Sequence, residues 1–121
     1  MRGFLWNWEK GVKGEFIISM DAKPVIFIVS DSIGETAELV ARAAAIQFNH
    51  GGVDIRRLSY VNDPNEIPEI MEEASSFNSV IAYTLVIPEL KELLVKEAAK
   101  YGIPTVDVLT PMMEAVSILV H

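Results

Sequence analysis

The sequence predicts an α/β fold, in which a doubly wound, four-stranded parallel sheet carries helices on both faces. Two observations lead to this prediction. Short apolar runs rich in β-branched residues alternate along the chain with longer segments whose apolar residues recur at helical spacing. The connections between these segments are short, and such an alternation gives parallel strands joined by right-handed crossovers. We expect the strand order 2-1-3-4.

The first half of this pattern predicts two strands separated by a helix. Residues 25–29 are continuously apolar, which is typical of a strand buried on both faces. A helix is expected over residues 35–48, where alanines at helical spacing allow close approach to a sheet. Residues 49–52, with the sequence NHGG, should end this helix. The second strand is expected over residues 53–61.

The second half repeats the alternation. The sequence NDPNE begins the next helix, since Asn62 or Asp63 can cap it and Pro64 suits its first turn. This helix is expected to reach about Ser76. A strand over residues 79–84 and a helix from Pro88, which Gly102 ends, should follow it. The last expected elements are a strand over residues 105–109 and a helix from Pro111 onward. Together these elements complete the predicted sheet and its helical layers.

The last predicted helix carries an apolar stripe. Its members fall on one side of the helix at helical spacing: Met112, Ala115, Val116, Leu119 and Val120. Two alternatives follow from this stripe. Either it packs on the sheet beside the fourth strand, or it mediates association, in which case we expect a homodimer through this C-terminal helix.

The composition indicates one small globular domain. The chain has 121 residues, half of them hydrophobic, so a core can form without covalent cross-links. Cysteine is absent, which excludes disulfides and thiolate metal sites. The net charge of −7 argues against a nucleic-acid or anionic-membrane partner, because both favour a basic surface. We therefore expect a cytoplasmic protein.

Residues 1–23 differ from the remainder and form an N-terminal extension to the Rossmann-like α/β domain expected over residues 24–121. They contain both tryptophans but show no sustained periodicity. Met20 precedes a segment that reads as an ordinary protein start. Residues 1–19 are therefore either an upstream extension from a start codon assigned too early, or an arm that packs its apolar side chains on the domain or on a partner.

A polar turn, residues 30–36 with the sequence SDSIGET, follows the first strand. In an open parallel sheet, ligands bind beyond the carboxyl ends of the strands where the strand order reverses, which here lies between strands one and three. Gly34 allows the backbone to turn tightly, and the helix that follows offers unpaired N–H groups and the positive end of its dipole. Hydroxyl groups add donors at Ser30, Ser32 and Thr36. The polar turn therefore suits a phosphate group.

The same residues also have a simpler interpretation. Ser30 or Ser32 could merely cap the helix, with Glu35 completing a capping box. Asp31 would repel a bare phosphate. Its carboxylate suggests instead that the turn binds a metal ion, binds a hydroxyl group or transfers a proton. Neither the dinucleotide-binding fingerprint nor the common lysine-containing phosphate-loop motif occurs in the chain.

Other charged residues have structural explanations. Arg56 and Arg57 are neighbours in the second predicted strand. The simplest interpretation is that this is an edge strand and that each of its two faces carries one of these charges. Asp63 and Glu66 are most simply capping residues. Asp107 near the end of the fourth strand faces either the ligand crevice or solvent, and the sequence does not decide between them.

Four segments carry a more specific signal: IVSDSIGETAELVARAAAIQF, VDIRRLSYVNDPNEI, TLVIPELKELLVKEAAKYGIPTVDVL and PMMEA. Together they resemble the N-terminal part of the pyruvate, phosphate dikinase and phosphoenolpyruvate synthetase regulatory proteins, and the resemblance covers residues 24–116. Its most specific element is S-D-S-x-G-E-T after a strand, with Y-V-N-D and Y-G-I-P-T-V-D in register. Ile33 stands where this family usually has Thr, which removes one hydroxyl from the polar turn.

The resemblance implies a bifunctional enzyme. Members of the family are ADP-dependent kinases that phosphorylate a threonine of the dikinase and switch it off, and they remove that phosphate with inorganic phosphate as acceptor, releasing pyrophosphate. Their C-terminal part carries a phosphate loop that this sequence lacks. The chain is thus expected to be the N-terminal domain of such a protein and inactive alone. The alternative is a stand-alone phosphate- or nucleotide-binding flavodoxin-like module.

The resemblance also implies ligands and partners. For the full-length protein they are ADP or ATP, inorganic phosphate and, as a candidate metal, Mg²⁺; the partner is pyruvate, phosphate dikinase or phosphoenolpyruvate synthetase. The expected phosphate-binding residues are Ser30, Ser32, Gly34, Glu35 and Thr36. Asp31 is the candidate catalytic residue, as a base toward a threonine hydroxyl or as a Mg²⁺ ligand, with a purely structural role as the third alternative.

Overall fold

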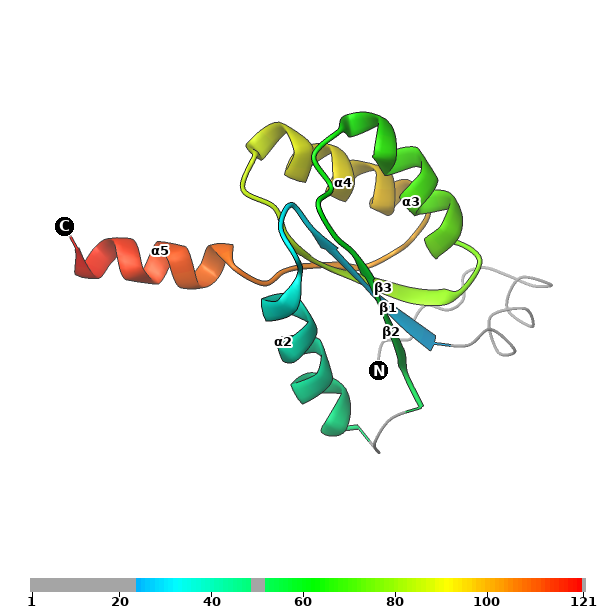
Figure 1. Cartoon of the computed structure of the whole chain (residues 1–121), viewed down its shortest axis with the longest axis horizontal. Coiled ribbons are helices and arrows are strands. Elements are labelled where there is room, and N and C mark those ends of the chain that lie inside the picture. Colours follow the sequence, from blue (N-terminus) through cyan, green and yellow to red (C-terminus); the bar gives the residue numbers. More distant parts are fainter. Residues whose placement is uncertain (1–23, 49–51, 121) are drawn as a thin grey trace.

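The computed structural model describes residues 24–48 and 52–120, which form the expected α/β fold (Figure 1). The elements in chain order are β1 (Pro24–Ser30), α2 (Glu35–Ile46), β2 (Asp54–Leu58), the short 3-10 helix η1 (Pro64–Glu66), α3 (Ile67–Ala74), β3 (Asn78–Thr84), α4 (Pro88–Lys100), β4 (Thr105–Asp107) and α5 (Thr110–Leu119). The N-terminal extension, residues 1–23, and most of the helix stop at residues 49–52 lie outside the described residues. Among those described, no helix has the length and apolar character needed to cross a membrane.

The four strands form one parallel sheet in the order β2-β1-β3-β4, as the sequence predicts. In this register Ser30, the last residue of β1, lies beside Thr84, the last residue of β3. Leu58, the last residue of β2, pairs with Val29 on the other side of β1. The exits of three strands therefore meet at one edge of the sheet.

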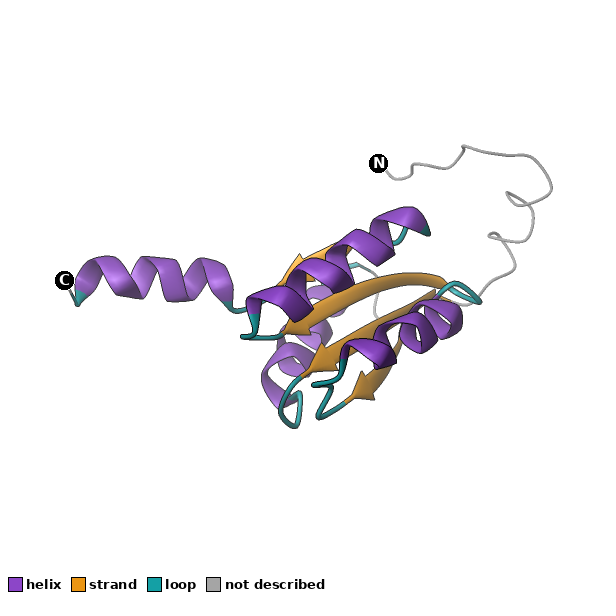
Figure 2. Cartoon of the chain, turned by 90° about the horizontal axis from the view of Figure 1, so that it is seen from above, coloured by secondary structure: helices purple, strands orange, loops and turns teal. Residues whose placement is uncertain are grey.

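The sheet lies between helices on both faces (Figures 1 and 2). Helices α3 and α4 cover one face and pack against each other. Alternate residues of β1 point into this layer and are buried there: Val25, Phe27 and Val29. On the opposite face α2 contacts the sheet through Ala37 and Ala41, which pack with Ile28 and Ala82. The expected doubly wound arrangement is confirmed.

The start of the α3 segment follows the predicted capping chemistry. The Asp63 carboxylate accepts a hydrogen bond from the Asn65 N–H (2.9 Å), and the Glu66 side chain accepts one from the Asp63 N–H (3.1 Å). These reciprocal bonds form a capping box at η1, with Pro64 at its first position. The structural interpretation of Asp63 and Glu66 is confirmed.

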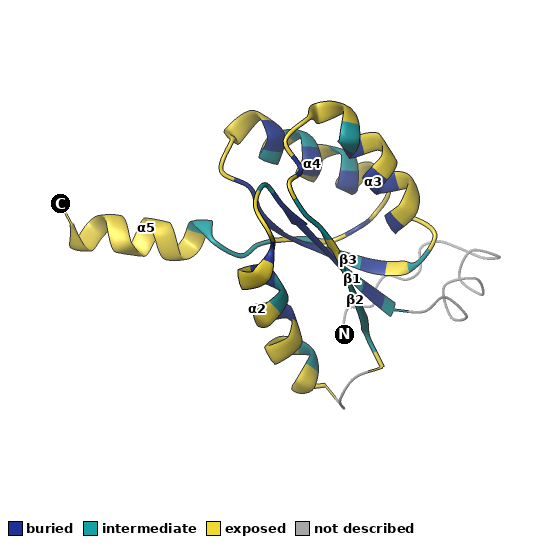
Figure 3. Cartoon of the chain, in the orientation of Figure 1, coloured by how far each residue is buried: buried dark blue, intermediate teal, exposed yellow. Residues whose placement is uncertain are grey.

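Helix α5 departs from the expectation that its apolar stripe packs beside β4. It extends away from the sheet (Figure 1), and Figure 3 shows it exposed along its length beyond the first residue. The side chains that should have been covered have high exposed fractions, 44% for Val116 and 82% for Leu119. The packed alternative is therefore wrong for the described chain.

The direction of α5 has a local cause at the end of β4. The Asp107 carboxylate accepts hydrogen bonds from the N–H groups of Leu109 (3.2 Å) and Thr110 (2.9 Å). From α4, the Lys91 ammonium donates to the Thr110 hydroxyl (3.1 Å) and lies 3.5 Å from the Asp107 carboxylate. These contacts end β4 two residues earlier than predicted and orient the first turn of α5. Asp107 is thus a helix-capping residue.

The cluster around Asp107 also sets its ionisation. Burial disfavours the charged carboxylate, but hydrogen bonds from Thr110 and the nearby Lys91 ammonium outweigh that effect and lower the pKa of Asp107. Burial, together with this carboxylate, raises the pKa of the neighbouring Tyr83. Asp107 is therefore ionised at neutral pH and can hold the first turn of α5.

Candidate functional site

A shallow hollow of about 190 Å³ lies at the carboxyl edge of the sheet, where the exits of β1 and β3 meet. Its lining residues are Asp31, Ser32, Ile33, Gly34, Glu35, Thr36, Thr84, Val86 and Leu109. Six of them come from the polar turn, residues 30–36. The predicted position of the crevice, between the first and third strands, is therefore the position of the hollow.

Ser30 supports this hollow from beneath and is fully buried. Its hydroxyl accepts hydrogen bonds from the Thr84 hydroxyl (2.9 Å) and from the Ser32 N–H (3.0 Å), and lies 3.1 Å from the Ser32 hydroxyl. It therefore joins the exits of β1 and β3 and orders the turn, while the exposed Ser32 is the hydroxyl that reaches the hollow.

Asp31 is also held between the two strand exits. Its N–H donates to the Thr84 carbonyl (3.3 Å), and its Oδ2 accepts from the Val86 N–H (3.0 Å). One carboxylate oxygen is thus engaged in joining β1 to the segment after β3. Asp31 has a structural contribution, and its half-buried carboxylate still borders the hollow.

The start of α2 differs from the capping-box alternative. The residue before the helix is Gly34, in the left-handed region with φ +91°, and no described side chain accepts a hydrogen bond from the first turn. The reason is that α2 begins at Glu35, so its cap position falls on Gly34, which has no side chain, and not on Ser30 or Ser32. Because the first N–H groups of a helix have no partner within it, the start of α2 presents donors beside Glu35 and Thr36 at the hollow.

The charge around the hollow opposes strong anion binding. Asp31 and Glu35 bring carboxylates to its rim, and none of the described residues that line it is a lysine or arginine. The Arg57 guanidinium contacts the polar turn itself, but through the Ile33 carbonyl (3.0 Å), and it does not line the hollow. Attraction for an anion must therefore come from backbone N–H groups, hydroxyls and the α2 dipole.

The segment after β2 holds the polar turn in place, although the sequence pattern alone did not identify it. The N–H of Tyr60 donates to the Ser32 carbonyl (2.9 Å), and the N–H of Val61 donates to the Ser30 carbonyl (2.8 Å). Tyr60 has φ +58°, which is uncommon for a residue other than glycine. The available signal was the strand order, because a strand paired with β1 must end beside the turn that follows β1.

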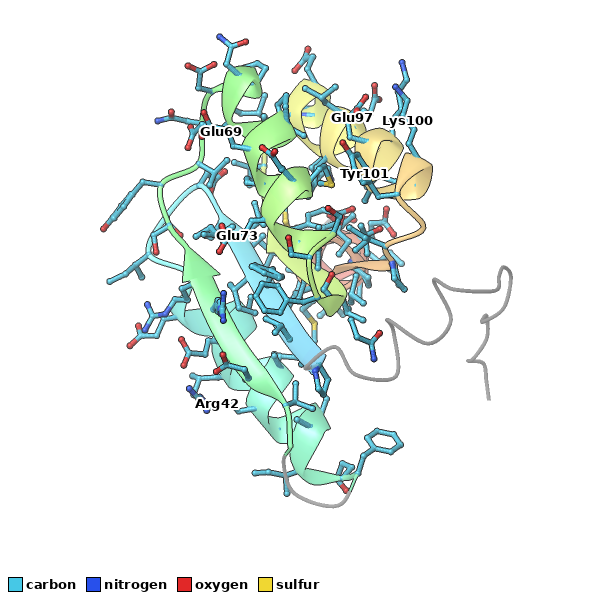
Figure 4. The ribbon with its side chains drawn as sticks, turned by 90° about the vertical axis from the view of Figure 1, so that its right-hand side faces the viewer. Arg42, Glu69, Glu73, Glu97, Lys100 and Tyr101 are labelled. Carbon is cyan, nitrogen blue, oxygen red and sulfur yellow. The ribbon has the colours of Figure 1, made fainter. Side chains whose placement is uncertain are left out.

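Arg56 and Arg57 point to opposite faces of β2, as expected for neighbouring strand residues. The Arg56 guanidinium lies 3.6 Å from the Glu73 carboxylate and 4.5 Å from the centre of the Phe77 ring. Arg57 donates to Glu38 on α2. Figure 4 shows the two environments: Glu73 of α3 lies on one side of β2, and Arg42 of α2 lies on the other.

With this geometry established, comparison with known proteins identifies the family. Residues 26–121 match the family described as kinase/pyrophosphorylase. The chain belongs to this family. The matched region includes nearly all of β1, the whole polar turn and every later element that the structure describes.

Individual relatives support the same family assignment. A pyruvate, phosphate dikinase regulatory protein of Carboxydothermus hydrogenoformans is 48% identical over 97 residues, which are 80% of this chain and 35% of the relative. A protein of the same name from Alkaliphilus oremlandii is 52% identical over 94 residues, 78% of this chain and 34% of the relative. A pyruvate, phosphate dikinase regulatory protein of Syntrophomonas wolfei is 54% identical over 92 residues, which are 76% of this chain and 34% of the relative. The chain thus spans about a third of the length of these relatives.

Proposed function

We propose that this chain is the N-terminal α/β domain of a bifunctional regulatory kinase and phosphorylase. Its target would be a threonine of pyruvate, phosphate dikinase or phosphoenolpyruvate synthetase, phosphorylated with ADP as donor and dephosphorylated with inorganic phosphate as acceptor. One observation carries the proposal: the polar turn, the most specific part of the family resemblance, lines the hollow at the carboxyl edge of the sheet. The names of the relatives support the dikinase as a target.

The ligand that we assign to the hollow is a phosphoryl group or inorganic phosphate. Its volume of about 190 Å³ is below the range of about 300–1,000 Å³ typical of pockets for larger ligands. Ser32 and Thr36 supply hydroxyl donors, and Gly34 and the start of α2 supply backbone N–H groups. We assign ADP or ATP to the part of the full-length family proteins that this chain does not span.

Asp31 is the residue that we assign to the chemical step, either as a base toward the threonine hydroxyl or as a Mg²⁺ ligand. Its carboxylate borders the hollow and is positioned by the Val86 N–H. Among the described residues, no group of three or more His, Cys, Asp or Glu side chains could hold a metal. A Mg²⁺ ion here would therefore need phosphate oxygens and water as its other ligands, which is a common arrangement for this ion.

Phosphate binding is directly measurable. We expect a titration with inorganic phosphate to move the amide resonances of Ser32, Gly34 and Thr36, with weak affinity. Gly34→Ala should weaken this binding, because Gly34 has φ +91° and a Cβ there would lie 3.2 Å from Arg57 Cδ. Gly102→Ala is the matched control: Gly102 has φ +71°, but it ends α4 and a Cβ there meets no atom within 4 Å. Resonance changes confined to other regions would reject the site.

The catalytic part of the proposal predicts that this chain alone is inactive. Phosphoryl transfer depends on positioning and neutralising the nucleotide phosphates, and no lysine-containing phosphate loop occurs in the sequence. Incubation with ADP and a cognate dikinase should leave the dikinase threonine unmodified, in a cytoplasmic extract or with purified proteins. Phosphothreonine formation would overturn this assignment.

The alternative function is a stand-alone phosphate- or nucleotide-binding flavodoxin-like module. It is favoured by the position of the hollow at the carboxyl edge of a parallel sheet, where proteins of this architecture bind small ligands. The two functions differ in their partner: the regulatory domain should bind a dikinase or synthetase, whereas the module should bind its small ligand without one. Co-sedimentation of the chain with each enzyme distinguishes them.

We also propose that the chain forms a homodimer through α5. All five of its larger apolar side chains, and that of Val120 just after it, are at least 44% exposed: Met112, Met113, Val116, Ile118, Leu119 and Val120. The contacts of Asp107 and Lys91 direct this helix away from its own sheet, where Val106 of β4 is 51% exposed. A second copy of the chain could cover apolar surface that the helix and sheet of one copy do not cover for each other.

Light scattering over a concentration series tests this association. The wild-type chain should form a dimer that Leu119→Asp converts into a folded monomer. Leu39→Asp is the control, because Leu39 is 65% exposed on α2 and is not part of the α5 surface. A wild-type chain that is monomeric at high concentration would contradict the proposal.

A further inference from the structure

Arg57 contacts the polar turn from β2, which pairs with β1 on the side away from β3, whereas the hollow lies where β1 and β3 end. Its Nη1 donates to the Ile33 carbonyl (3.0 Å), and its Nε donates to the Glu38 carboxylate at the first part of α2. The Ser59 hydroxyl donates to the same Ile33 carbonyl (2.7 Å). One carbonyl of the turn therefore receives two side-chain donors, both from the β2 side.

The backbone of the next two residues extends this contact. The N–H groups of Tyr60 and Val61 donate to the carbonyls of Ser32 and Ser30. Three carbonyls of the polar turn, those of Ser30, Ser32 and Ile33, thus point toward the segment that follows β2. Residues 57–61, the last two of β2 and the three after it, provide every one of these donors and are called the back segment below.

The orientation of these carbonyls determines where the N–H groups point. In a planar trans peptide, the C=O of one residue and the N–H of the next point in opposite directions. A bond that holds the Ile33 carbonyl toward Arg57 therefore turns the Gly34 N–H away from Arg57. In the same way, the bond from Tyr60 to the Ser32 carbonyl turns the Ile33 N–H away from the back segment. These two backbone donors are therefore directed away from the β2 side, and the hollow lies on the β3 side of β1.

Arg57 also packs directly on the glycine that precedes α2. A Cβ at Gly34 would lie 3.2 Å from Arg57 Cδ and 3.4 Å from Ile28 Cγ2. The arginine stem therefore fills the space behind Gly34, so the turn cannot move back toward β2 without meeting it. The guanidinium bond and the packing of the stem restrict the same two residues, Ile33 and Gly34.

Glu38 keeps the guanidinium in place. Its carboxylate accepts hydrogen bonds from Arg42 and Arg57, and these two cations lower the pKa of Glu38. The Glu38 carboxylate is therefore ionised at neutral pH. Its ion pair with Arg57 then connects α2 to β2. A lysine at position 57 would lack the planar fork that reaches a carbonyl and a carboxylate together.

We propose that Arg57 is a positioning residue for phosphate binding, which holds the polar turn so that its backbone N–H groups face the hollow. This role rests on the proposed phosphate site, and it acts through the Ile33 carbonyl and Gly34 rather than by contact with the ligand. Ser59 contributes the second donor to the same carbonyl.

Two variants at position 57 and one matched control test this role. Arg57→Gln should weaken the binding of inorganic phosphate about tenfold, which corresponds to about 1.4 kcal/mol. Arg57→Lys should not restore the affinity, because the charge alone does not hold the carbonyl. Arg56→Gln is the control, since Arg56 is on the same strand but contacts Glu73 and Phe77 on the other face. Its phosphate affinity should equal that of the wild type.

Amide hydrogen exchange provides a second measurement that does not depend on phosphate. Arg57→Gln and Arg57→Lys should accelerate exchange of the Tyr60 and Val61 N–H groups, which bond the turn, while Arg56→Gln leaves their exchange unchanged. Thermal denaturation of each variant separates this local change from general loss of stability.

The outcomes distinguish the two proposals. Wild-type affinity for phosphate in Arg57→Gln would overturn the positioning role while leaving the phosphate site intact. Absence of phosphate binding by the wild-type chain would overturn the proposed site, and the exchange rates would then decide whether Arg57 holds the turn. Unchanged exchange in both position-57 variants would overturn the role of Arg57.

Discussion

The two faces of the sheet are built differently, as Figure 3 shows. On the face covered by α3 and α4, fifteen of the described residues form a buried cluster that includes Phe27, Met71 and Leu94. On the face covered by α2, the corresponding cluster has four described residues: Ile28, Ala37, Ala41 and Ala82. Since the free energy gained by burial scales with apolar area, the α3–α4 face contributes most of the stability.

The smaller cluster has a consequence for the site. Because Ala37 and Ala41 are small, α2 can approach the sheet closely, and its start reaches the edge where β1 ends. The same helix carries Glu38, which binds Arg57 behind the polar turn. One face therefore mainly stabilises the domain, whereas the other places a helix start at the hollow.

The largest expected effect comes from breaking the larger cluster. Leu94 of α4 is fully buried, and Leu94→Ala should reduce the free energy of unfolding by about 2–5 kcal/mol. Urea denaturation measures this loss, and phosphate affinity of the remaining folded protein should be unchanged. Val95→Ala on the same helix is the control, because Val95 is 38% exposed and should lose far less stability. Equal losses in both variants would contradict this view of the α3–α4 face.

A smaller effect on stability, with a larger effect on the site, is expected on the α2 face. Ala41→Leu should cost about 1–3 kcal/mol through overpacking and should move α2 outward. Phosphate binding should weaken, because the start of α2 moves with the helix. Ala43→Leu introduces the same side chain at an exposed position of α2 and should alter neither property. Normal phosphate binding by Ala41→Leu would show that close approach of α2 is not required.

The smallest expected effect concerns Asp107, whose contacts orient the first turn of α5. The folded-state pKa of Asp107 is below its ordinary value of 3.8, so its carboxylate stabilises the fold above that pH. This contribution is lost as the pH falls through the lowered pKa. The difference in melting temperature between the wild type and Asp107→Asn should therefore be present near neutral pH and shrink in strong acid. A difference that stays constant with pH would contradict this role of the carboxylate.

Much of the fold could be predicted because its signals are local or periodic. The apolar run of β1, the helical spacing of the alanines in α2 and the capping chemistry at Asp63 each depend on residues close together in the sequence. The position of the hollow could also be predicted, since strand order and the polar turn together determine which loops meet.

The sequence by itself determined the order of the elements, the parallel sheet and the polar turn at its edge, because periodicity and short connections permit few other arrangements. Tertiary structure alone decided how that turn is held. The contacts of Arg57 and Tyr60 with it span many residues and arise only when β2 pairs beside β1. The direction of α5 is set jointly by Asp107, which is close in the sequence, and by Lys91 of α4, which reaches Thr110 only once the chain has folded. An apolar stripe specifies that a helix has a side to bury, but it does not specify which surface that side meets, because the contacts at the helix start form only in the folded chain.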